Sequence, residues 1–140
     1  DLGALIQAIC DDASDIGNDV TVMPLSGKII IHGQPVALRR AFSNLIDNGL
    51  RYGHRVRAFL ERTDDRISVR IKDDGPGIPD EEIKRVFEPF YRCDRSRSEN
   101  TEGTGLGLSL AKTVIENHGG TVELNNEATS GLTVTVTLPR

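Results

Sequence analysis

The spacing of apolar residues predicts three main helices. In three stretches they recur every three or four positions, which places them on one face of a helix. These stretches are residues 2–15, 34–52 and about 106–118. Gly53 is expected to stop the second helix, and the buried face of the third is expected to consist of Leu110, Ala111, Val114, Ile115 and His118. A short helix is expected from residue 80, because acids at 80–82 precede bases at 84–85, the order that the helix dipole favours.

Alternation of apolar and polar residues predicts about six short strands. They are residues 20–23, 28–31, 56–61, 66–72, 121–124 and 132–138. Turn residues at 26–27 and 64–65 would join neighbouring strands into hairpins. The threonines that alternate through the last strand indicate a sheet with one open face.

The strand at 66–72 ends in two carboxylates and then in a glycine-rich turn. Side chains alternate along a strand, so Asp73 shares the face of the apolar residues and Asp74 lies on the other face. An unpaired carboxylate at the edge of a core is costly, so a hydrogen-bond partner for Asp73 is expected. The alternative is an ordinary turn that contains aspartate.

A polar column follows one face of the helix at 34–52. Asn44, Asn48 and Arg51 stand at positions i, i+4 and i+7, apart from the apolar face. An amide oxygen can bind Mg²⁺ and a guanidinium can bind phosphate, so the column could hold a metal-bound anion. An ordinary solvated helix face is the alternative.

Glycines alternate at 103–107 and run directly into the last helix. Free N–H groups at a helix N-terminus, with glycines that allow close backbone approach, form a phosphate cradle. The segment lacks the lysine of a Walker P-loop and follows a loop, which argues against a Rossmann site. Residues 92–102 contain almost no apolar side chain and are expected to form a mobile loop.

Composition narrows the class of protein. A chain of 140 residues is expected to form one domain, 1–140, and a net charge of −4 carries no signature of nucleic-acid binding. Cys10 and Cys93 lie too far apart for a zinc motif or a disulfide framework, which fits a reduced, cytoplasmic setting. No apolar run approaches the roughly 18 residues of a membrane span.

Four motifs, in their order along the chain, resemble those of a known protein family. Residues 44–52 resemble the N box, 73–77 the G1 box, 87–90 the F box and 103–107 the G2 box of the catalytic ATP-binding domain of sensor histidine kinases, of the osmosensor-kinase type. The resemblance covers nearly the whole chain. It implies the Bergerat fold, an α/β sandwich in which three main helices pack on one face of a mixed sheet of five to six strands.

The resemblance also implies roles for individual residues. Asn48 would bind Mg²⁺, with Asn44 supporting it, and Arg51 would lie near the phosphates. Asp73 would accept a hydrogen bond from the amino group of adenine, and residues 92–104 would form the ATP lid. The positions implied to contact nucleotide are Asn48, Arg51, Tyr52, Asp73, Gly75, Gly77, Ile78, Phe87, Arg92, Gly103, Thr104, Gly105, Leu106 and Gly107.

Phosphoryl transfer is favoured over ATP hydrolysis. Hydrolysing relatives carry a glutamate base at the position of Asn44, and an amide cannot take a proton. The acceptor would be a histidine of a separate dimerisation and phosphotransfer domain, because His32, His54 and His118 lie in no phosphoacceptor motif and are expected to be structural.

This domain is expected to be a cytoplasmic monomer. Its parent would be a homodimeric inner-membrane sensor that signals to a response regulator. The alternatives are a gyrase- or chaperone-type ATPase clamp, a serine kinase of the anti-sigma type and a non-catalytic ATP sensor.

Overall fold

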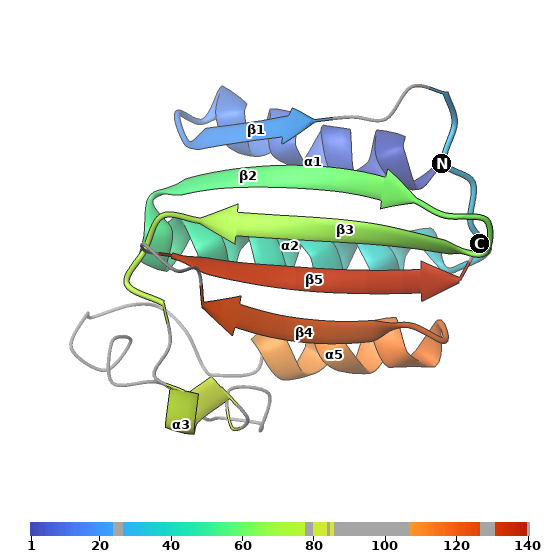
Figure 1. Ribbon diagram of the computed structural model, residues 1–140. Coiled ribbons are helices and arrows are strands. Elements are labelled where there is room, and N and C mark those ends of the chain that lie inside the picture. The colour runs from blue at the N-terminus through green and yellow to red at the C-terminus, as the bar shows by residue number, and fades with distance from the viewer. Residues whose placement is uncertain (24–26, 78–79, 84, 86–106, 127–130, 140) are drawn as a thin grey trace.

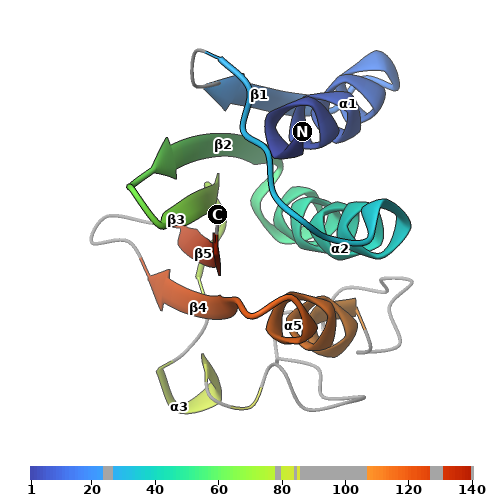
Figure 2. The ribbon, with the colours of Figure 1, turned by 90° about the vertical axis from the view of Figure 1, so that its right-hand side faces the viewer.

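A computed structural model describes residues 1–23, 27–77, 80–83, 85, 107–126 and 131–139, with backbone alone at 52, 80 and 82. Within these residues, five strands form one mixed sheet, and α1, α2 and α5 cover one of its faces (Figures 1 and 2). The expected α/β sandwich is confirmed.

Nine elements follow one another along the described chain. The helices are α1 (Leu2–Asp15), α2 (Pro35–Gly53), α3 (Asp80–Ile83) and α5 (Gly107–Asn117), and the strands are β1 (Asp19–Met23), β2 (Arg55–Arg62), β3 (Arg66–Asp73), β4 (Thr121–Asn126) and β5 (Leu132–Pro139). The sheet order is β1-β2-β3-β5-β4. β1 pairs in parallel with β2 through the crossover helix α2, and the other pairs are antiparallel.

The core lies between the sheet and the three helices, with α2 in the middle (Figure 2). The inward residues of β3 are almost fully buried, whereas Ser68, Arg70 and Lys72 face the open side and are half-buried. On α2, the apolar face that the sequence predicts is fully buried. Its side chains are Leu38, Ala41, Phe42, Leu45 and Ile46.

The expected strand at 28–31 is wrong. Ile29 is buried, but its carbonyl accepts a hydrogen bond from the N–H of Leu2 at 2.7 Å, and its own N–H donates to the Asp1 carboxylate at 3.4 Å. These backbone groups therefore complete the first turn of α1, where helical N–H groups lack partners, and they are not available to a sheet.

Two details of the helices also differ from expectation. Gly53 was expected to stop α2, but it is the last helical residue, and His54 caps the helix in the left-handed conformation with φ 64°. Leu110 was expected on the buried face of α5, yet it is 49% exposed. The buried stripe of α5 is narrow, with Ala111 and Ile115 at its centre, and Leu110 lies about 100° around the helix from Ala111.

Candidate nucleotide-binding site

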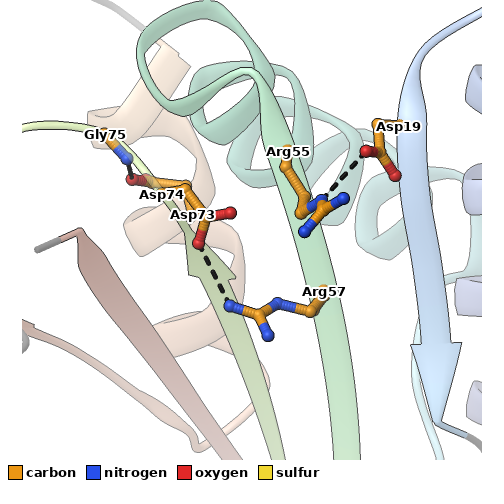
Figure 3. Close-up of polar contacts among 6 residues, drawn as sticks. All are labelled: Asp19, Arg55, Arg57, Asp73, Asp74 and Gly75. Atoms are coloured by element: carbon orange, nitrogen blue, oxygen red, sulfur yellow. Dashed lines mark hydrogen bonds and ion pairs between the residues drawn. The ribbon is translucent and has the colours of Figure 1, made fainter.

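Asp73 ends β3 on the buried face, as strand parity predicts. It is only 5% exposed, and its Oδ1 accepts a hydrogen bond from the N–H of Gly75 at 2.9 Å (Figure 3). Asp74 points to the open face, where its carboxylate pairs with the guanidinium of Arg57 at 3.1 Å. The two neighbouring carboxylates therefore occupy different environments, and only Asp73 belongs to the interior.

The surroundings of Asp73 come from the two neighbouring strands and from α2. Val56 of β2 and Leu132 of β5 are its cross-strand partners, and both are buried. On the helix side lie Gly49 and Gly53, one turn apart, and a Cβ atom at either would come within 4 Å of Asp73. Asp73 thus sits where the sheet meets the C-terminal turns of α2.

The turn after β3 is held close to β4. Gly75 and Gly77 are buried, and Gly77 has φ +77°, a conformation that glycine adopts without strain. A Cβ atom at Gly77 would lie 2.4 Å from Oδ1 of Asn126. Asn126 therefore packs directly on the turn, a role that no pattern in the sequence indicated.

The first residue of the polar column on α2 contacts the start of α5. Asn44 and Asn48 are half-buried and Arg51 is exposed, as an outer helix face requires. The side-chain amide of Asn44 donates to the carbonyl of Gly107 at 3.4 Å. This contact joins the N box to the last glycine of the G2 box, through two residues that are 63 positions apart in the chain.

The two ends of the site lie along one helix. Asn44 contacts the N-terminal residue of α5, and Gly53 contacts Asp73. These two positions of α2 are nine residues apart, which is roughly 13.5 Å at 1.5 Å per residue. One rigid element therefore sets the separation between the two ends.

The carboxyl of Asp47 is the one acid of this helix. Partial burial raises its pKa, and the nearby charge of Arg51 opposes that shift. A folded-state pKa above the unfolded value of 3.8 means that the folded protein holds this proton more tightly. Asp47 therefore lowers the free energy of unfolding as the pH rises through the interval between the two values.

The side chains at this end of the site suit a metal ion that is coordinated mainly by phosphates and water, with few protein ligands. Within the described part of the chain, no three His, Cys, Asp or Glu side chains gather as metal ligands would. Asn48 offers an amide oxygen on a half-buried surface. Mg²⁺ keeps several waters and is commonly bound by one or two protein ligands together with phosphates, so a single amide fits it.

Several predicted contacts lie outside the described residues. They are the side chain of Tyr52 and residues Ile78, Phe87, Arg92, Gly103, Thr104, Gly105 and Leu106. Residues 92–104, the expected lid, fall in the same part of the chain. Of the G2 box, only Gly107 is described, as the exposed first residue of α5.

The three histidines are all described, and their surroundings agree with structural or surface roles. His118 accepts a hydrogen bond from the N–H of Gln34 at 3.0 Å through Nε2, and its Nδ1 lies 2.8 Å from the carbonyl of Val114. His54 ends α2, and His32 is exposed.

Comparison with known proteins identifies relatives over most of the chain. The sequence profile of the histidine kinase-, DNA gyrase B- and HSP90-like ATPase family matches residues 33–140. The sensor histidine kinase CpxA of Escherichia coli K12 is 36% identical over 129 residues, which are 91% of this chain and 28% of CpxA. The chain spans about a quarter of the length of the curated relatives it matches.

Solved structures show the same fold. The mycobacterial sensor histidine kinase MprB is 29% identical with a TM-score of 0.81, over 99% of this chain and 95% of that one. The histidine kinase domain of the E. coli osmosensor EnvZ is 32% identical with a TM-score of 0.77, over 99% and 86%. Among the described residues, no helix is both long and apolar enough to cross a bilayer.

Proposed function

Because the chain belongs to the histidine kinase-, DNA gyrase B- and HSP90-like ATPase family, in its sensor histidine kinase branch, we propose that it binds Mg·ATP and donates the γ-phosphoryl group to a histidine of a partner domain. The observation that carries this proposal is the pairing of a buried carboxylate at the C-terminal end of α2 with the Asn44–Gly107 contact at the middle of the same helix.

Asp73 is the proposed acceptor for the amino group of adenine. The hydrogen bond from the N–H of Gly75 fixes the carboxylate of Asp73 before nucleotide binds. Binding therefore costs little further conformational entropy at this side chain. A carboxylate accepts from the amino group of adenine, whereas guanine presents a carbonyl at that position. The nucleotide preferred by this site is therefore an adenine nucleotide.

Asn44, Asn48 and Arg51 form the proposed phosphate end. Asn48 would hold Mg²⁺ through its amide oxygen, and the ion would neutralise charge on the transferred phosphoryl group. Arg51 is exposed and its guanidinium can reach phosphate oxygens. The N–H groups at the start of α5 add donors at the same end.

Transfer to a histidine is favoured over hydrolysis. Asn44 cannot act as a general base, and its amide already donates to the carbonyl of Gly107. Positioning and electrostatics supply most of the catalysis in phosphoryl transfer, so an acceptor imidazole brought in by another domain is sufficient.

The remaining parts of the proposal concern the parent protein. The acceptor histidine would belong to a dimerisation and phosphotransfer domain, and the phosphoryl group would pass on to a response regulator. The domain would work as a cytoplasmic monomer within a homodimeric inner-membrane sensor. Relatives named sensor histidine kinases, several times longer than this chain, support this arrangement.

The direct test is transfer between separate domains. The domain is incubated with [γ-³²P]ATP, Mg²⁺ and a dimerisation and phosphotransfer domain from a related sensor kinase. We expect acid-labile label on the histidine of the acceptor, and we expect Asn48→Ala to reduce it at least 100-fold. Gln7→Ala is the control, because Gln7 is a half-buried residue of α1 whose side-chain amide donates to Asp11. Rapid release of phosphate by the isolated domain, without transfer, would instead indicate an ATPase clamp.

A further inference from the structure

Gly53 has the closest contact with the buried carboxylate. A Cβ atom at this position would lie 2.4 Å from Cβ of Asp73 and 2.7 Å from its Oδ1. Cβ atoms essentially never come within 3.0 Å of another heavy atom, so even alanine requires a shift. Gly49, one turn earlier, is less demanding toward Asp73, because its Cβ would stay 3.6 Å from Cβ of Asp73.

Asp73 has little room to move away. Its backbone pairs with Val56 on one side and Leu132 on the other, and Oδ1 is held by the N–H of Gly75. A methyl group at Gly53 would therefore turn the carboxylate or push the last turn of α2 away from the sheet.

The backbone of Gly53 does not itself require glycine. The residue is helical, and it is not among the described glycines with positive φ. Gly53 is the last residue of α2, and alanine can adopt a helical conformation there as readily as glycine. The need for glycine is therefore one of space, and Asp73 occupies that space.

We infer that Gly53 is a positioning residue that sets the purine selectivity of the site, by letting the carboxylate of Asp73 lie directly against α2. This inference rests on the proposed function, because it assigns Asp73 to the amino group of adenine. Gly53 itself would not touch nucleotide and would act only through Asp73. Its own substitution should therefore change which base binds, with a smaller effect on folding.

The test compares ATP with purine riboside triphosphate, which lacks the 6-amino group. Mg²⁺-dependent binding of both is measured by titration calorimetry for the wild type, Gly53→Ala and Gly3→Ala. Gly3→Ala is the matched control, since it is also a glycine-to-alanine change within a helix, and its Cβ meets nothing closer than 3.3 Å.

We expect the wild type and Gly3→Ala to prefer ATP by about 10-fold or more, the size of one hydrogen bond to a charged group. In Gly53→Ala the ratio should fall below about 3-fold, because ATP binding weakens while the analogue is nearly unaffected. An unchanged ratio in Gly53→Ala would overturn the inference. Failure of the wild type to bind either nucleotide would overturn the proposed function instead.

If Gly53→Ala does not fold, the same substitution is tested in a protein that also carries Asp73→Gly. Asp73→Gly removes the side chain that the new methyl group would meet. Gly53→Ala should then have no destabilising effect in thermal unfolding when it is added to Asp73→Gly. If it still prevents folding there, the contact with Asp73 is not the reason that position 53 requires glycine, and the inference fails.

Discussion

At the scale of single residues, burial distinguishes two side chains that look equivalent in the sequence. Asp73 and Asp74 are adjacent carboxylates, yet Asp73 is 5% exposed, while the side chain of Asp74 is 42% exposed and paired with Arg57. A buried carboxylate needs hydrogen-bond donors, whereas an exposed ion pair contributes little to stability. Asp73 is therefore the carboxylate that we propose to recognise a ligand group.

Replacing each carboxylate by its amide tests this difference. Asp73→Asn should weaken ATP binding by about 10- to 100-fold, because a hydrogen bond to a charged acceptor is worth roughly 1.5–3 kcal/mol. Asp74→Asn should change it by less than about 2-fold. Titration calorimetry with Mg·ATP measures both, and equal losses in the two variants would contradict the assignment of faces.

At the scale of elements, contacts between helices and loops connect the parts of the site. α5 begins at Gly107, which contacts Asn44 of α2, and it is anchored at its other end by His118. The ring of His118 accepts from the N–H of Gln34, just before α2 begins, and a Cβ atom at Gly33 would lie 2.7 Å from it. Both ends of α5 are thereby fixed to α2 or to the residues that lead into it.

Removing the anchor at His118 should loosen α5. His118→Leu deprives the N–H of Gln34 of its partner and should lower the free energy of unfolding by about 1 kcal/mol, or the melting temperature by roughly 3–6 °C. Thermal denaturation followed by circular dichroism measures this. His32→Leu, an exposed histidine in the same chain, should leave the midpoint within about 1 °C. Equal shifts would show that the hydrogen bond contributes nothing.

At the scale of the whole molecule, the site exists only in the folded chain. Its described parts come from α2, the end of β3, the start of α5 and Asn126 of β4, which the sheet and its helices bring together (Figure 1). Nucleotide that binds such a site binds the folded state alone and stabilises it by mass action.

Ligand binding should therefore raise the melting temperature in a metal-dependent way. ATP at about 100 times its Kd, with Mg²⁺ present, should add roughly 2.7 kcal/mol to the free energy of unfolding. EDTA should remove most of this gain in the wild type. In Asn48→Ala the gain should be small with or without EDTA. A metal-independent gain of full size in both proteins would contradict the role of Asn48.

Local patterns in the sequence were sufficient for most elements and for the faces of α2 and β3. Periodicity identified the buried side of α2 and placed Asp73 inward, because a side chain's face follows directly from helix and strand geometry. It was wrong at 28–31, where Ile29 is buried and its backbone groups bond to Asp1 and Leu2 at the start of α1. Periodicity reports burial, but it cannot say which partner a backbone group takes.

Four motifs in order also identified the family from the sequence alone, and the comparisons confirm it. What only the tertiary structure decided is which residues touch across the chain. Gly53 was expected only to stop a helix, but the side chain of Asp73 lies directly against it. No pattern in the sequence indicated that Asn126 packs on the turn at Gly77. These contacts depend on how α2 and β4 pack against the end of β3, and such packing leaves no local pattern because the residues are far apart in sequence.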